Sequence, residues 1–173
     1  TSLAMFSTRV PLALQEKGHD IRTIIPKYGY VSERKYILRE VIRLREIPFE
    51  FNGSNKVASA KSAFIPKTRV QVYFMEHSDY FSDTSELLYK SRNGRLYSNN
   101  QERFTFFVKA SIETLKKLYW IPDYIICSDW QMSMASLIIC LSCLLVTFIV
   151  VSSMLRKVSR RLQNQDPKEL PNF

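Results

Sequence analysis

The chain has 173 residues, 46% of them hydrophobic, and 25 Lys and Arg against 16 Asp and Glu give it a net charge of +9. The length suits one domain large enough to bury a core. The positive charge is spread without a stripe of arginines and interleaved aromatics, which argues against nucleic-acid binding. Three cysteines and two isolated histidines exclude a disulfide framework and predict no metal site.

The first segment predicts a helix followed by a strand. Residues 8–17 form the predicted helix, with Thr8 as its N-cap, Pro11 in its first turn and Gly18 after its end. Residues 20–25 then predict a short apolar strand. Helix, glycine and strand in so few residues are typical of an α/β domain.

A polar connection over residues 27–34 leads to three predicted strands. Residues 38–51 alternate as one strand, and Asn52-Gly53 is a strong hairpin signal because both residues tolerate positive φ. Residues 56–64 would return from that turn, and residues 69–75 would form the third strand. The chain therefore predicts a β-hairpin inserted into an α/β fold.

Residues 77–100 predict a long surface loop. Its aromatic side chains, if exposed, could hold a sugar, although such residues also serve to fix a loop in place. These candidate aromatics are Tyr80, Phe81, Tyr89 and Tyr97.

The clearest amphipathic helix covers residues 99–119, and a strand is expected at residues 123–127. The apolar positions of the helix follow the i, i+3, i+4 pattern. Asn99 and Glu102 have the spacing of a capping box. Pro122 should end this helix before the strand.

Residues 134–155 form an uninterrupted run without a charged residue. As a helix it would span roughly 33 Å, enough for a hydrocarbon core about 30 Å thick. A buried core helix is the alternative, but basic residues follow at once, as is typical at a membrane interface. The predicted anchor runs from Met134 to Leu155 and is followed by Arg156, Lys157, Arg160 and Arg161.

The sequence thus predicts three parts. Residues 1–133 form an α/β domain, residues 134–155 one transmembrane helix, and residues 156–173 a basic, flexible tail.

Four blocks of the domain resemble bacterial glycogen and starch synthases. They are residues 11–35, 69–81, 99–120 and 122–131, and they stand in the family's order. The resemblance implies a Rossmann-like, three-layer α/β domain, the N-terminal, acceptor-side half of a GT-B glycosyltransferase. In that family a second half holds most of the ADP-glucose site. The family's first strand and this second half are not expected in the chain.

The first departure from the family concerns its phosphate loop, a Lys-Thr-Gly-Gly-Leu sequence. The corresponding residues here are Thr1, Ser2, Leu3 and Ala4, without the lysine and both glycines. Close backbone approach to a phosphate requires residues without a Cβ. We therefore expect a degenerate phosphate loop.

The second departure concerns a motif of His, any residue, His or Asn, Asp and Trp. The chain has Ile126 and Ser128 at the two imidazole positions, whereas Asp129, Trp130 and Gln131 are retained. These three are candidate residual sugar contacts. The structural alternative, which we favour, is that Asp129 caps the next helix and Trp130 packs beneath it.

These features favour a non-catalytic, membrane-anchored accessory subunit of a larger membrane protein complex, without a catalytic residue or cofactor. A membrane-tethered glucan-binding module is one alternative, and a glucosyltransferase completed by a partner chain is another. Expected partners are integral membrane subunits and anionic lipid head groups at the basic tail, and the alternative functions would add glucan. We expect a single-pass protein of the inner membrane. The basic residues directly after the span favour a domain outside the cell, but the family resemblance and the basic charge of the domain itself favour a cytoplasmic domain, which is the orientation we expect.

Overall fold

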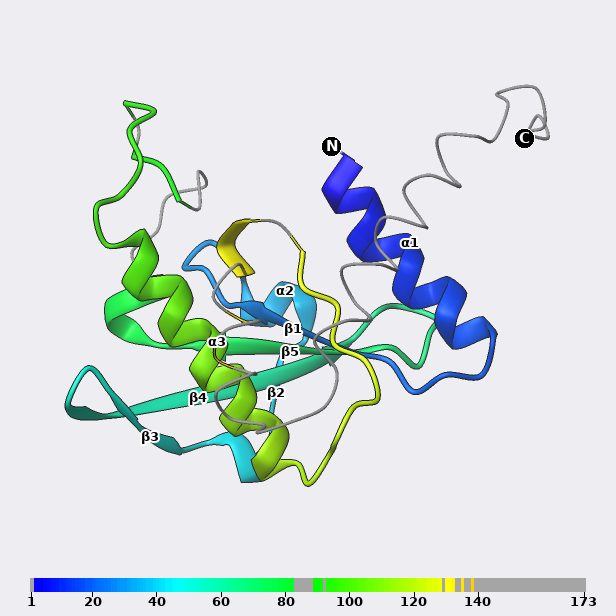
Figure 1. Ribbon diagram of the computed structural model, residues 1–173. Helices are drawn as coiled ribbons and strands as arrows, with labels where there is room; N and C mark the ends of the chain where they lie inside the picture. Colours follow the sequence, from blue (N-terminus) through cyan, green and yellow to red (C-terminus); the bar gives the residue numbers. More distant parts are fainter. Residues whose placement is uncertain are drawn as a thin grey trace. The chain divides into compact units, whose positions relative to one another are not determined.

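The computed structural model describes residues 2–82, 89–91, 93–128, 130–132, 135 and 138. The chain divides into two units, residues 1–123 and residues 124–173, and each is described by itself. The first unit contains a five-stranded mixed sheet with helices (Figure 1). The α/β prediction is therefore confirmed.

The elements of the first unit follow one another in this order. They are α1 (Ser2–Glu16), β1 (Arg22–Pro26), α2 (Glu33–Tyr36), β2 (Arg39–Glu40), the 3-10 helix η1 (Ile42–Leu44), β3 (Ile47–Phe51), β4 (Ser54–Phe64), β5 (Gln71–Glu76), the π-helix η2 (Ser78–Ser82) and α3 (Asn100–Lys117). The second unit contains the 3-10 helix η3 (Trp130–Met132).

The sheet has the strand order β1-β5-β4-β2, and β3 also pairs with β4. Strands β1 and β5 are parallel, whereas β4 runs antiparallel to β5, β2 and β3. Parallel neighbours place their carboxyl ends at the same edge of the sheet, and Pro26 of β1 lies opposite Met75 of β5.

The hairpin prediction at Asn52-Gly53 is confirmed. Both residues have positive φ, 50° and 72°, and Phe51 pairs with Ser54 across the turn. The single strand predicted over residues 38–51 is wrong, because η1 separates β2 from β3. The alternation of apolar residues in the sequence reports which side chains are buried, and it does not report which backbone segments pair. It can therefore continue through a turn such as η1.

Helix α3 packs against the sheet face that carries the buried side chains of β3, β4 and β5 (Figure 1). Phe106 is completely buried, with its ring centroid 5.1 Å from that of Phe49 and 5.4 Å from that of Phe51. The helix was predicted correctly, but its capping box was not. Asn99 makes no capping hydrogen bond, and Glu102 instead accepts one from the Tyr80 hydroxyl at 2.7 Å.

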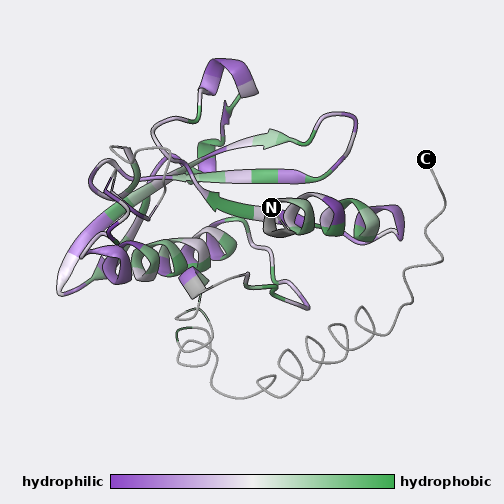
Figure 2. Cartoon of the chain, turned by 90° about the horizontal axis from the view of Figure 1, so that it is seen from above, coloured by the Kyte–Doolittle hydropathy of each residue, from purple (hydrophilic) through white to green (hydrophobic). Residues whose placement is uncertain are grey.

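Helix α1 begins at Ser2, before the predicted start at Thr8. Pro11 therefore lies inside the helix and not in its first turn. The preceding residues include Leu, Ala and Met, which are strong helix formers and extend the helix upstream. Figure 2 shows hydrophobic and hydrophilic residues interleaved along this helix, which begins at the label N.

Two further predicted segments differ in the structure. The end of the polar connection predicted at residues 27–34 is helical, because α2 begins at Glu33, and its N-cap Ser32 accepts a hydrogen bond from the backbone of Lys35 at 3.3 Å. The strand expected at residues 123–127 does not form, and no described strand pairs with this segment. A β-branched, apolar run becomes a strand only when a neighbour receives its backbone hydrogen bonds.

In the part of the chain that the structure describes, no helix has both the length and the apolar character needed to cross a bilayer. The predicted span from Met134 to Leu155 lies outside the described residues except for two single positions. The tail residues Arg156, Lys157, Arg160 and Arg161 also lie outside them.

Candidate functional site

The carboxyl ends of β1 and β5 form the edge at which an α/β sheet ordinarily binds ligands. Lys27 follows β1 directly, and its backbone N–H extends the ladder by donating to the Met75 carbonyl at 2.7 Å. Glu76 ends β5, and His77 follows it. This sheet edge, with the side chains that surround it, is the candidate site.

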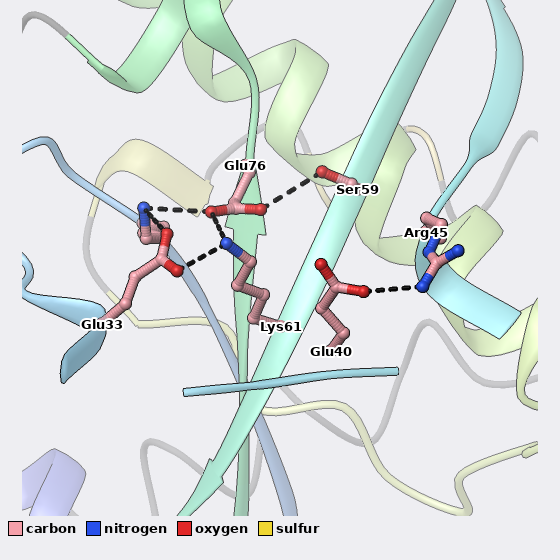
Figure 3. Close-up of polar contacts among 7 residues, drawn as sticks. Glu33, Glu40, Arg45, Ser59, Lys61 and Glu76 are labelled. Atoms are coloured by element: carbon pink, nitrogen blue, oxygen red, sulfur yellow. Dashed lines mark hydrogen bonds and ion pairs between the residues drawn. The ribbon is translucent and has the colours of Figure 1, made fainter. Parts of the chain in front are cut away.

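Two lysines and two glutamates form a closed ion-pair network at this edge (Figure 3). Lys27 Nζ lies 2.9 Å from Glu33 Oε1 and 3.0 Å from Glu76 Oε1. Lys61 Nζ lies 2.7 Å from Glu33 Oε2 and 3.4 Å from Glu76 Oε1. Ser59 Oγ donates to the other oxygen of Glu76 at 3.4 Å.

The network lies on the sheet face opposite to α3. Side chains alternate along β4, so that Ala58 and Ala60 are buried on the α3 side while Ser59 and Lys61 point the other way. Glu76 pairs with Ser59 across β4 and β5 and therefore shares that second face. The network thus joins α2, through Glu33, to the central strands of the sheet.

The network keeps Lys27, Glu33 and Lys61 in their ionised forms. Hydrogen bonds from Lys61 and Lys27 lower the pKa of Glu33 to about 2. Burial lowers the pKa of Lys27 and of Lys61, but their bonds to Glu33 and Glu76 outweigh it, so both pKa values are raised. General acid or base catalysis requires a pKa near the working pH, which these three groups do not have. The arrangement is suited to holding α2 in place.

A second contact locks the two loops at this edge together. The Gly29 backbone N–H donates to the Phe81 carbonyl at 3.0 Å, and a Cβ at Gly29 would lie 1.8 Å from the Ser82 carbonyl oxygen. Tyr28 packs edge-on against the Phe81 ring at 5.9 Å. Burial raises the pKa of Tyr28 to about 12, so its hydroxyl remains neutral. Glycine is required here by the close approach of η2.

His77 is half-buried at the same edge. Its ring centroid lies 4.5 Å from that of Phe106 and 4.8 Å from that of Tyr80, and Nδ1 accepts a hydrogen bond from the Asp79 backbone at 3.3 Å. Burial lowers its pKa, which favours the neutral ring. These contacts are those of a core histidine.

The aromatic residues considered for sugar binding are largely inside the protein. Tyr80 and Phe81 are 7% and 0% exposed, so they cannot form an open sugar platform. Arg103 Nε donates to the Tyr80 carbonyl at 2.7 Å and Nη1 to Asn100 Oδ1 at 2.9 Å, which anchors η2 on α3. Tyr89 and Tyr97 are half-buried.

The predicted phosphate-loop residues Ser2, Leu3 and Ala4 lie in the first turn of α1 and not in a loop, while Thr1 lies outside the described residues. Trp130 and Gln131 lie in η3, and Asp129 is outside the described part. Among the described residues, no group of His, Cys, Asp and Glu could hold a metal ion.

The sequence of residues 1–142 matches the family described as the starch synthase catalytic domain. The chain belongs to this family. It is 33% identical over 139 residues to a glycogen synthase of Chlorobium limicola and 33% identical over 138 residues to one of Chlorobaculum parvum. Each alignment covers 80% of this chain and 28% of the relative, so the chain spans between a quarter and a third of these relatives' length.

The fold is similar to a solved structure of the same family. That structure is the catalytic domain of starch synthase IV from Arabidopsis thaliana bound to ADP and acarbose. The TM-score is 0.64 at 24% sequence identity, and the alignment covers 79% of this chain and 26% of the other. The likeness supports the mixed α/β fold expected from the family resemblance.

The ion-pair network was missed at the level of sequence, although part of its signal was present. Lys27 and Glu76 each stand at the end of a predicted strand. Glu33 and Lys61 gave no such signal, because one lies in a helix of four residues and the other within a strand. Only the folded sheet brings these four side chains together.

The free energy of unfolding should fall as the pH is lowered from about 4.5 towards about 2, because Glu33 has a lower pKa in the folded chain than its ordinary value of 4.5. Glu33 contributes its full share of the free energy of unfolding above pH 4.5. This contribution is lost as the pH falls through the folded-state pKa of about 2. Since 44% of the side chain is exposed, we expect less than about 1 kcal/mol. Urea unfolding at several pH values measures this. The free energy of unfolding should depend less on pH for Glu33→Gln than for the wild type, while the control Glu50→Gln, at an exposed residue, should behave as the wild type. The same dependence on pH for both variants would contradict the prediction.

Replacing Gly29 with alanine should destabilise the protein by about 1–3 kcal/mol, because the new Cβ meets a backbone carbonyl that cannot move alone. The control is Gly94→Ala, where no atom lies within 4 Å of the new Cβ. At its φ of +76° an alanine costs only the strain of the left-handed backbone conformation, about 1–2 kcal/mol. Thermal unfolding followed by circular dichroism measures both. A larger loss for Gly94→Ala than for Gly29→Ala would show that the contact with η2 is not tight.

Proposed function

We propose that this chain is a non-catalytic, membrane-anchored accessory subunit of a larger membrane protein complex. Its scaffold is a glycogen-synthase-like, Rossmann-like domain in three layers. The observation that carries the proposal is the uncharged run of residues 134–155 with four basic residues in the seven positions after it. The domain keeps the family's core, and the run attaches that core to a membrane.

The non-catalytic part of the proposal is supported by residues that replace the family's chemical groups. Ser2, Leu3 and Ala4 each carry a Cβ and begin a helix, so they cannot give a phosphate the close approach that glycines allow. Ile126 and Ser128 stand where the resembling motif has imidazole donors. At the sheet edge Lys27, Glu33 and Lys61 are bound in one ion-pair network, and their pKa values lie far from neutrality.

The proposed location is the inner membrane, with one span and the domain on the cytoplasmic side. Integral membrane subunits would contact the span, and Arg156, Lys157, Arg160 and Arg161 would attract anionic lipid head groups. No cofactor is required for this role.

A glucan-binding module is the second candidate, because the related proteins are glycogen synthases and Asp129, Trp130 and Gln131 are retained. Its proposed ligand is an α-glucan chain. Completion of a glucosyltransferase by a partner chain is the third. Both of these would bring glucan or a soluble transferase into the purified material, whereas the accessory role would bring membrane subunits.

Interruption of the proposed span should release the chain from membranes. Leu145→Lys together with Ile149→Lys places two charges near the middle of the run, each at a cost of about 2.5–3.5 kcal/mol. We expect the wild type to remain in the membrane pellet after an alkaline carbonate wash and the double variant to leave it. The matched control carries Leu145→Val and Ile149→Val and should stay in the pellet; release of the wild type would refute the anchor.

Gentle detergent extraction followed by native purification through this chain tests the accessory role. Integral membrane proteins should be recovered in a fixed ratio with the wild type, as measured by mass spectrometry, and should be lost with the double-lysine variant. Recovery of the chain alone, or with glucan or a soluble transferase, would favour the other candidates.

A further inference from the structure

His77 stands directly before η2 and closes its first turn with both its backbone and its side chain. The His77 carbonyl accepts hydrogen bonds from the backbone N–H of Tyr80 at 3.3 Å and from that of Phe81 at 3.1 Å. The ring nitrogen Nδ1 accepts a third, from the backbone N–H of Asp79 at 3.3 Å. A side chain that accepts from the first turn in this way is an N-cap, a place usually taken by serine, threonine, aspartate or asparagine. At η2 the cap is a titratable group.

Protonation of the His77 ring removes this cap. Nδ1 accepts a hydrogen bond only while it carries a lone pair, so the neutral ring has its proton on Nε2. A second proton turns Nδ1 into a donor, which then faces the N–H donor of Asp79. The ring also lies against Phe106 and Tyr80, at 4.5 Å and 4.8 Å between centroids, where a positive charge has less contact with water. Both effects disfavour the imidazolium in the folded chain.

The charges closest to the ring oppose one another. On η2 the Asp79 carboxylate favours the imidazolium, and on β4 the Lys56 ammonium, 3.6 Å from Asp79 Oδ2, disfavours it. Burial has the largest effect, so the pKa of His77 is lowered from its usual 6.5. The Tyr80 hydroxyl stays neutral, because burial and its bond to a carboxylate raise its pKa. Three further charged groups of the packed elements bind other partners, and they are Glu76 of β5 and Glu102 and Arg103 of α3.

Helix η2 joins the loop after β1 to α3. The Phe81 carbonyl accepts the backbone N–H of Gly29 at 3.0 Å, and the Tyr80 carbonyl accepts Nε of Arg103 at 2.7 Å. Gly29 belongs to the loop that follows β1, and Arg103 belongs to α3. Opening of η2 therefore breaks both connections at once.

We propose that His77 is a pH-sensitive cap whose protonation opens η2 and releases it from the loop after β1 and from α3. When the ring is neutral, η2 is capped and closed. When the ring is protonated, η2 opens while the sheet and α3 stay together, because Phe106 keeps its contacts with Phe49 and Phe51. This regulation is separate from the proposed membrane anchor and does not depend on it.

The direction of the pH effect follows from the difference in proton binding between the two states. In the open state His77 titrates with its ordinary pKa of 6.5, whereas in the closed state it takes up a proton only at lower pH. The contribution of the cap to closure is therefore complete above pH 6.5 and is lost as the pH falls through the lower pKa of the closed state. The opening constant should rise about tenfold for each unit by which closure lowers the pKa.

The test combines two measurements on the full chain in mild detergent, from about pH 7.5 to about pH 5. NMR measures the pKa of His77, and the variant His19→Gln identifies its signal, since the chain has two histidines. Hydrogen exchange followed by mass spectrometry measures the opening of residues 77–82, with exchange times scaled to the intrinsic rate at each pH. We expect a pKa below 6.5 and opening on acidification by the factor that this pKa sets, while residues 104–115 of α3 keep their protection.

Two variants separate the cap from the rest of the ring. Asparagine places its amide oxygen close to the position of Nδ1, glutamine places it farther out, and neither side chain titrates. His77→Asn should therefore protect residues 77–82 better than His77→Gln, and neither variant should depend on pH in this range. Asp79→Asn should move the opening to lower pH, because it removes the carboxylate that favours the imidazolium.

Three results would overturn the inference. They are a His77 pKa at or above 6.5, acid-induced opening of residues 77–82 that persists in His77→Asn, and equal opening of residues 104–115, which would mean that the whole domain unfolds. Circular dichroism of each variant checks that the fold is kept. If a variant does not fold, the two measurements on the wild type still decide the outcome, because the measured pKa sets the size of the opening.

Discussion

The arrangement of the first unit depends on strand β4, which pairs with three other strands along its eleven residues. Its alternation puts small buried residues under α3 and sends Lys61 and Ser59 to the opposite face. The small side chains Ala58 and Ala60 leave room for the phenylalanine rings of α3 and β3. The hydrophobic layer and the ion-pair network are therefore set by the same strand, one on each face.

The site at the carboxyl ends of β1 and β5 has the location of a ligand site but the chemistry of a structural one. Parallel strands bring Lys27 and Glu76 together, and the two loops that follow are joined by the contact of Gly29 with η2. Each lysine faces two carboxylates, and Glu33 stays ionised to about pH 2. The membership in the starch synthase catalytic domain family describes the origin of this fold, whereas chemistry depends on the groups present at the site.

The proposed function raises one physical question, which is how a family core could be used at a membrane. In that proposal the uncharged run of residues 134–155 would supply the attachment.

The sequence alone determined features that depend on neighbouring residues. The hairpin at Asn52-Gly53 follows from two residues that tolerate positive φ, and α3 follows from its apolar period. The family could also be recognised, because its sequence blocks stand in order. The tertiary structure decided what depends on distant partners: the break between β2 and β3, the coil at residues 123–127, the burial of Tyr80 and Phe81, and the Glu33–Lys61 contact. Strand pairing decides which side chains face one another across a sheet and which strand receives a given strand's backbone hydrogen bonds. The periodic pattern of apolar residues in one segment does not say which distant segment will pair with it.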